Sequence, residues 1–287
     1  MPLKLEASGF RLEIGVARIE NLKLHEEIVS SYLLDLAETI EKDDKIRNPI
    51  IVDRESGVVL DGMHRVAAIS YLGYDKIPAC FVHYQDPELK LGSWCRVFKN
   101  LAIDEALELC EDLGFEIKET ESSHVKSSME KKLKKLFLVS KSNYYQISHE
   151  ADTIKEIFVM AEDLEEAIVK EGFEPKLVPE KGILEKLTVG ETAILIPPAK
   201  KEDVIEISQS KTVFSHKMTR HVIPARPLNV DVPLELLKED LQRVDEKITK
   251  KLNNLKIEHL PPGSTFEGRE YEEELVIFKT PHEEKDR

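Results

Sequence analysis

The chain has few cysteines, few aromatic residues and no long apolar run. Its 287 residues include three cysteines, and aromatic residues make up 6%. An odd number of widely spaced cysteines supports neither a disulfide framework nor a zinc cluster. No apolar segment reaches the roughly 18 residues of a membrane span, so we expect none. The segment Met1–Glu6 lacks the apolar core of a signal peptide, and we expect a cytoplasmic protein.

Positive charge is also in deficit. Lys and Arg number 41 against 55 Asp and Glu, which gives a net charge of −14. An acidic surface is repelled by nucleic acids and anionic membranes, so we expect neither as a partner, and any basic site must be local. The sequence also has no Walker A lysine loop, no His-Arg-Asp catalytic loop and no Gly-x-Ser-x-Gly elbow.

Apolar periodicity predicts an α/β (α+β) protein of two domains. Residues 50–52, 58–60 and 77–84 have the pattern of buried strands. Helical spacing occurs in 31–42, 61–72, 103–113, 153–170 and 234–255. The pattern changes beyond about residue 115, and we expect a first domain over 1–115 and a second α+β domain over 116–287.

The strongest local signal is the segment from Asp61 to Arg65. A buried strand ends there and a helix begins, so backbone N–H groups and the positive end of the helix dipole can bind phosphate. Gly62 permits close approach, and Arg65 can add a charge-assisted contact. His64 can donate to a phosphate, and Asp61 can cap the helix or hold a metal ion. A plain capped helix would have the same residues.

A second candidate is Glu26, at a corner between a strand and a helix. Its carboxylate can act as a general base, or it can simply favour the start of a helix. Trp94, the only tryptophan, belongs either to the core or to the wall of a small pocket.

A third candidate is the loop with Thr219-Arg220-His221 and Arg226. Two prolines, at 224 and 227, stiffen it. Cations and donors in such a loop can bind a carboxylate or a phosphate, and they can equally be ordinary surface charge.

The segment Asp61–Arg65, with the strands around it, resembles the ParB/sulfiredoxin superfamily over residues 15–100. Sulfiredoxins need a cysteine where this chain has Met63, and partition-type ParB proteins continue into a basic DNA-binding region that is not found here. The free L-serine kinases of this superfamily are more similar. They share His25-Glu26, Trp94, the block 219–230, and Pro262-Gly263 with 271–278.

This resemblance implies a ParB/sulfiredoxin-like N-terminal domain that binds nucleotide and a second domain that brings the 219–230 loop to the same cleft. It implies phosphorylation of free L-serine to O-phospho-L-serine with ADP or ATP and Mg²⁺, for cysteine biosynthesis. Glu26 would accept the hydroxyl proton, with Asp61 and His64 as further catalytic groups and Asp61 as a magnesium ligand. The phosphate-binding residues would be Gly62, Met63, His64, Arg65 and Arg226, and the serine-binding residues Trp94, Thr219, Arg220 and His221.

Two other functions fit the same residues. One is a ParB-like nucleotide-binding regulator or NTPase without a small-molecule acceptor. The other is a ParB-like nuclease, which the net charge of −14 disfavours. The sequence leaves open the donor nucleotide, selectivity against threonine or homoserine, and the oligomeric state.

Overall fold

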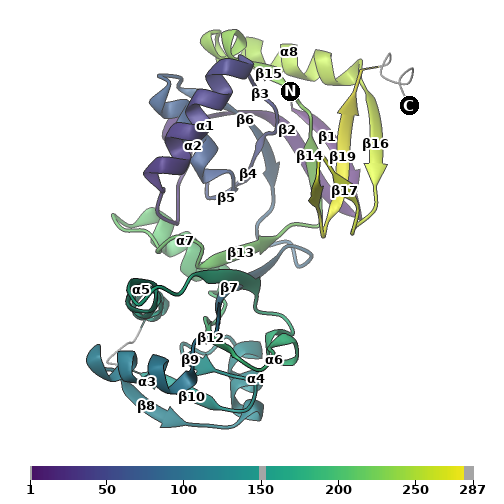
Figure 1. Cartoon of the computed structure of the whole chain (residues 1–287). Coiled ribbons are helices and arrows are strands. Elements are labelled where there is room, and N and C mark those ends of the chain that lie inside the picture. The colour runs from purple at the N-terminus through teal and green to yellow at the C-terminus, as the bar shows by residue number, and fades with distance from the viewer. Residues whose placement is uncertain (1, 149–152, 281–287) are drawn as a thin grey trace. The chain divides into compact units, whose positions relative to one another are not determined.

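The computed structural model describes residues 2–148 and 153–280. The chain forms two compact units (Figure 1). The first unit contains the residues up to Lys90 and those from His221 onward, and the second contains Leu91–Arg220. This division differs from the boundary predicted at residue 115. Residues 91–115 pair and pack with later parts of the second unit, whereas the C-terminal segment returns to pair with the first.

A five-stranded sheet forms the centre of the first unit. Its order is β1-β2-β6-β4-β5, and only the β4–β6 pair is parallel. The strands are β1 (Leu3–Ala7), β2 (Phe10–Arg18), β4 (Ile50–Asp53), β5 (Val59–Asp61) and β6 (Lys76–Val82). All four residues of β4 are buried, and six of the seven in β6 are buried, which confirms the predicted buried strands.

Two helices that pack on each other belong to this part, α1 (Ser30–Asp43) and α2 (Met63–Tyr71), preceded by the short helix η1 (Ile19–Asn21). The C-terminal segment adds a sheet of β14 (Ala225–Leu228), β19 (Glu274–Lys279) and β16 (Lys256–Leu260). It also pairs β15 (Val232–Pro233) with β3 (Lys45–Ile46). A short hairpin joins β17 (Thr265–Phe266) to β18 (Arg269–Glu270).

One predicted helix is wrong. Residues 234–255 form a 3-10 helix, η2 (Leu234–Lys238), and a separate helix, α8 (Leu241–Asn253). Glu239 and Asp240 are extended between them. Because the chain breaks there, the buried leucines of η2 and the buried stripe of α8 can both enter the core. Helix α8 packs on β2.

A seven-stranded sheet forms the centre of the second unit. Its order is β11-β7-β12-β9-β10-β8, with β13 also paired to β7. The strands are β7 (Lys90–Lys99), β8 (Glu116–Glu119), β9 (Leu136–Val139), β10 (Tyr144–Ser148), β11 (Pro175–Pro179), β12 (Glu191–Leu195) and β13 (Thr219–Val222). The helices are α3 (Ile103–Asp112), α4 (Ser122–Glu130), α5 (Ile154–Lys170), α6 (Ile183–Lys186) and α7 (Lys201–Gln209). The mixed architecture confirms the predicted α/β class.

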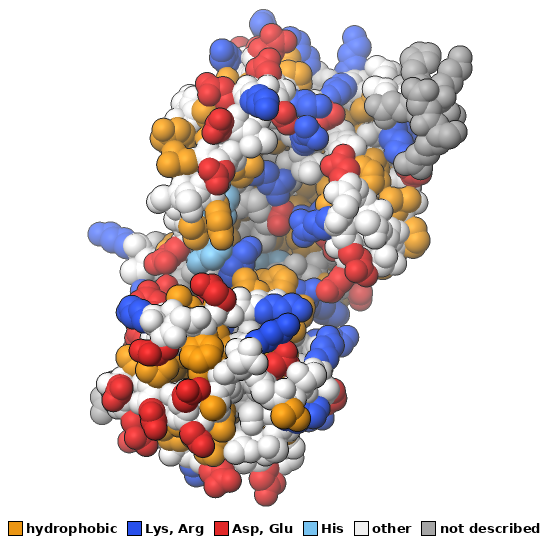
Figure 2. Space-filling view, viewed as in Figure 1, with side chains coloured by type: hydrophobic (Ala, Val, Ile, Leu, Met, Phe, Trp, Pro, Cys, Tyr) orange, Lys and Arg blue, Asp and Glu red, His pale blue; other side chains and the backbone are white. Residues whose placement is uncertain are grey.

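The distribution of surface charge and the state of the cysteines agree with the composition of the chain. Acidic and basic side chains are interspersed on the face shown in Figure 2. Among the described residues, no helix combines the length and the hydropathy needed to cross a membrane. The three cysteines are buried and free, and burial raises the pKa of each thiol to about 12, as expected for inert thiols.

Arg96 on β7 is a buried charge of the second unit with four hydrogen-bond partners. Its side chain is 2% exposed, and its Nε lies 2.6 Å from a carboxylate oxygen of Glu165 on α5. Its other nitrogens donate to the backbone carbonyls of Trp94, His216 and Lys217. One guanidinium group therefore joins the sheet, α5 and the segment that leads into β13.

We expect Arg96→Met to lower the free energy of unfolding of the second unit by about 3 kcal/mol, because a half-buried carboxylate and three backbone carbonyls lose their donor. Urea unfolding followed by fluorescence of Trp94, the only tryptophan, measures this unit. Lys170→Met, at an exposed ion pair on α5, is the control and should change little. Equal urea midpoints for Arg96→Met and the wild type would contradict the prediction.

Candidate active site

The predicted phosphate turn forms a sharp junction between β5 and α2. Gly62 is the N-cap of α2, with φ of 94°, a conformation that favours glycine. A Cβ atom there would lie 2.6 Å from Nη2 of Arg65. The prediction that Asp61 caps the helix is wrong, because no side chain caps it. The first turn of α2, which begins at Met63, therefore has no side-chain acceptor at its N-cap.

Asp61 instead lies between two arginines. Its Oδ2 accepts hydrogen bonds from Arg226 at 2.7 Å and from Arg65 at 2.5 Å. Arg226 also donates to Glu273 at 2.6 Å. Burial raises the pKa of the Asp61 carboxyl, but the charges of Arg226 and Arg65 outweigh it and hold that pKa well below its usual range. Asp61 is therefore ionised at neutral pH.

These contacts do not fit the predicted magnesium site at Asp61. Its Oδ2 is already bonded to two guanidinium groups, whose charges would repel a cation. Across residues 2–148 and 153–280, no group of three or more His, Cys, Asp or Glu side chains could hold a metal ion. Mg²⁺ commonly binds through substrate phosphates with only one or two carboxylates, so a metal that arrives with the nucleotide needs no such group.

Arginines from three segments line a cavity of about 300 Å³ in the first unit. Arg65 belongs to α2, Arg226 to β14 and Arg269 to β18, and Asp61 also lines the cavity. Arg65 uses Nη1 to hold the backbone carbonyls of Asn48 and Pro49, at 2.8 and 2.9 Å. The cavity therefore has an excess of fixed positive charge, which suits an anion such as phosphate.

Glu26 lies in the connection between η1 and α1. Its exposed fraction is 4%, and the preceding His25 is fully buried. Lys23 pairs with Val58 next to β5, which places the start of this connection beside the strand that leads to the phosphate turn. Burial lowers the pKa of His25 to about 4, only partly offset by a hydrogen bond to the backbone of Val59, so its ring is neutral at pH 7.

His64 joins this connection to α2. The backbone N–H of Val29 donates to its Nε2 at 3.1 Å. An Nε2 that accepts a hydrogen bond assigns a neutral ring with its proton on Nδ1. The ring of Tyr32 on α1 lies beside it, with centroids 5.9 Å apart.

His221 is also held in the first unit, by a residue that sequence analysis missed. The hydroxyl of the buried Tyr84 lies 2.8 Å from Nε2 of His221. The His221 ring packs edge-on against the His25 ring, with the centroids 5.1 Å apart. The backbone N–H of Tyr84 in turn donates to Asp53 at 2.9 Å. The sequence signal that could have identified Tyr84 is its position, as an aromatic residue with a hydroxyl group, at the end of the apolar run 77–84.

The other predicted substrate residues lie in the second unit. The Arg220 guanidinium is 5.3 Å from the centroid of the Trp94 ring, within the range of a cation–π contact. Thr219, next to Arg220 on β13, is buried. Trp94 is only partly buried, so it is not a plain core residue, and its ring contacts Arg220.

Known proteins similar to the chain include several kinases. An ATP-dependent L-serine kinase from Staphylothermus marinus is 32% identical over 230 residues, which covers 77% of this chain and 89% of the relative. The chain belongs to the L-serine kinase family. An ADP-dependent L-serine kinase from Thermococcus kodakarensis is 24% identical, with 76% and 90% covered. A ParB-like protein from Sulfolobus acidocaldarius is 26% identical, with 71% and 87% covered.

A solved structure shares the fold of this family. A free serine kinase mutant in complex with AMP gives a TM-score of 0.66 over 78% of this chain and 93% of that one, at 23% identity. No model of a known protein family matches the chain. The family resemblance read from the sequence is thus confirmed.

The structure brings most of the predicted residues into the first unit. These are Glu26, Asp61, Gly62, Met63, His64, Arg65, His221 and Arg226. The sequence analysis missed Arg269 and Tyr84, and it named His25 only as part of the shared His25-Glu26 motif, without a role. Arg269 lies in a segment with no phosphate-binding pattern. His25 is adjacent to Glu26 in the sequence.

We expect stability to fall with acid through His25. Its pKa is about 4 in the folded chain against an ordinary 6.5, so the unfolded chain binds the proton more tightly between these values. The contribution of the neutral His25 to the free energy of unfolding is complete above pH 6.5 and is lost as the pH falls toward 4. Between pH 7 and 5 the free energy of unfolding falls by about 2 kcal/mol.

Urea unfolding followed by circular dichroism at pH 7, 6 and 5 measures this loss. His25→Gln, which cannot be protonated, should lose about 2 kcal/mol less than the wild type over the range. His83→Gln, at a half-exposed histidine, is the control. The assignment fails when His25→Gln and the wild type have the same pH dependence.

Proposed function

We propose that the protein transfers a phosphoryl group from a nucleotide to the hydroxyl of free L-serine, and that its phosphoserine serves cysteine biosynthesis. Membership of the L-serine kinase family supports the reaction. The observation that carries it is the presence, in one compact unit, of an arginine-lined cavity at a strand-to-helix turn and a buried carboxylate at Glu26. Phosphoryl transfer depends mainly on positioning and on stabilised charge, which such a site supplies.

The nucleotide phosphates are proposed to bind at the start of α2. The backbone N–H groups that follow Gly62, from Met63 onward, provide donors, and the helix dipole favours negative charge. Arg65, Arg226 and Arg269 add positive charge around the adjoining cavity. Asp61 orients two of these arginines, so its role here is to position cations rather than to bind metal.

Glu26 is the proposed general base. A serine hydroxyl is weakly acidic, so its proton must leave as the oxygen attacks the phosphorus atom. A carboxylate held away from bulk water, beside a neutral His25, can accept that proton. His64, whose Nε2 accepts the N–H of Val29, is proposed to contact the transferred phosphoryl group.

The serine itself is proposed to bind through Trp94, Thr219, Arg220 and His221. The Arg220 guanidinium suits the α-carboxylate of serine, and the Trp94 ring holds that guanidinium in place. Tyr84 is a proposed positioning residue, because its hydroxyl fixes the His221 ring.

The reaction and its donor are tested by ³¹P NMR of the purified protein with Mg²⁺, L-serine, and ADP or ATP in parallel. The names of the relatives include both donors, and the tube that forms phosphoserine identifies the one used here. Nucleotide turnover that ignores serine would instead support the ParB-like regulator.

We expect Glu26→Gln to lower kcat by about 10²–10⁴ with little change in KM, because the base acts only as the proton leaves. The same ³¹P assay measures the rates. Glu27→Gln, at the exposed neighbouring residue, is the matched control and should retain activity. Full activity of Glu26→Gln would remove this residue from the mechanism.

We expect Arg220→Ala to raise the KM for serine about tenfold or more and to leave the KM for nucleotide unchanged, because a charge-assisted bond to the carboxylate is lost. Arg220→Lys should restore part of the affinity, since it keeps the charge. Steady-state kinetics with each substrate varied separates the two constants. An unchanged serine KM would exclude Arg220 from the serine site.

A further inference from the structure

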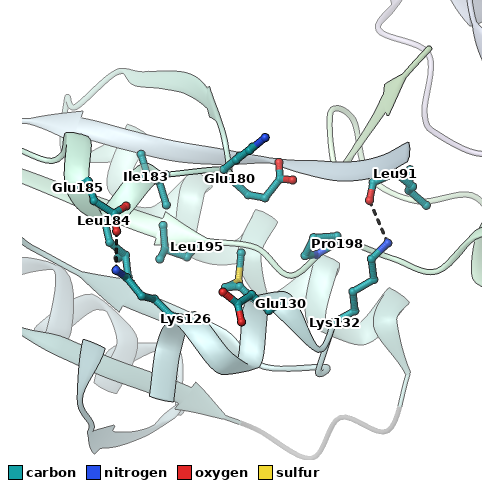
Figure 3. Close-up of a pocket in the computed structure, with 13 residues that line it drawn as sticks. Leu91, Lys126, Glu130, Lys132, Glu180, Ile183, Leu184, Glu185, Leu195 and Pro198 are labelled. Carbon is teal, nitrogen blue, oxygen red and sulfur yellow. Dashed lines mark hydrogen bonds and ion pairs between the residues drawn. The ribbon is translucent and has the colours of Figure 1, made fainter. Parts of the chain in front are cut away.

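A second cavity, of about 420 Å³, lies entirely within the second unit (Figure 3). None of the proposed serine-binding residues lines it. Its apolar lining includes Met129, Ile183 and Leu195, which also pack in the core of this unit. This volume is in the range of small-molecule sites.

The charges that line this cavity balance. Three lysines and three glutamates face it, and one pair, Lys126 and Glu185, is joined at 2.5 Å. Figure 3 shows this pair and Lys132 at opposite ends, with Leu195 and Glu130 between them and Glu180 above. A lining that offers both signs around an apolar surface complements a ligand that also carries both.

Lys132, at one end of the cavity, has a strained backbone conformation. Its φ is 52°, in the left-handed region where a lysine is strained, just after α4 ends. Glycine would relieve that strain, but the lysine ammonium donates to the carbonyls of Leu91 at 3.0 Å and Ala199 at 3.3 Å. These contacts use two of its three N–H donors, and a ligand carboxylate can accept the third.

Glu180 is fixed in a complementary way. One of its carboxylate oxygens accepts the N–H of Ser93 at 3.2 Å. Its side chain occupies the space left by Gly92, where a Cβ atom would lie 2.4 Å from the carboxylate. A carboxylate fixed at the cavity wall can accept a hydrogen bond from a ligand ammonium group.

We propose that this cavity binds a free α-amino acid with an apolar side chain, in its zwitterionic form. Lys132 binds the ligand carboxylate, Glu180 binds the ammonium group, and the side chain packs on Met129 and Leu195. This inference does not depend on the proposed kinase reaction.

The test uses the full chain with methyl-labelled methionine and L-leucine as the probe. Isothermal titration calorimetry should show saturable binding, and NMR should show a shift of the Met129 methyl signal, identified by its loss in Met129→Leu. The buried Met160 on α5, which does not line the cavity, is an internal control. N-acetyl-L-leucine, which lacks the ammonium group, and L-leucinamide, which lacks the carboxylate, should both bind at least about tenfold more weakly.

Variants assign the two charges. Glu180→Gln and Lys132→Gln should each weaken L-leucine binding about tenfold, and Glu166→Gln, at an exposed residue of α5, should not. The proposal is overturned by the absence of saturable binding at millimolar L-leucine, by equal binding of the three ligands, or by an unmoved Met129 signal. Displacement of L-leucine by L-serine that Arg220→Ala abolishes would place the ligand at the serine site and would also overturn it.

Discussion

The carboxylate of Asp61 allows the guanidinium groups of two arginines to lie close together in the first unit. Arg65 and Arg226 would repel each other there, but both bond to the same oxygen. Their segments, α2 and β14, are thereby fixed to the end of β5. Glu273, just before β19, balances Arg226. Removing Asp61 would leave the half-buried Arg65 without its carboxylate partner and Arg226 with Glu273 alone, which costs more than losing an exposed ion pair does.

The phosphate turn depends on the same arrangement. Gly62 has no side chain, so the Arg65 guanidinium can fold back over it to reach Asp61 and two backbone carbonyls. The arginines are therefore fixed before any anion arrives, which lowers the entropy lost on binding. Glu26, His25 and His64 are held beside this turn by backbone pairing and by the Val29–His64 bond.

Local patterns in the sequence predicted the elements of this site, because they depend on neighbouring residues. The strand, the glycine and the helix around Gly62 lie within a few positions of one another, as do the residues beside Glu26. The break between η2 and α8 was not predictable in this way, since it depends on which leucines the core accepts. The position of Arg269 was equally hidden, because its own segment has no distinguishing pattern.

The sequence by itself determined the α/β class, the acidic surface, the buried strands and the family, all of which follow from composition, periodicity and short motifs. Only the tertiary structure decided that Asp61 positions arginines, that Tyr84 holds His221, and that the C-terminal segment completes the first unit. Asp61 and Arg226 are 165 positions apart. A contact between such distant residues is set by how the whole chain packs, and no local pattern encodes it.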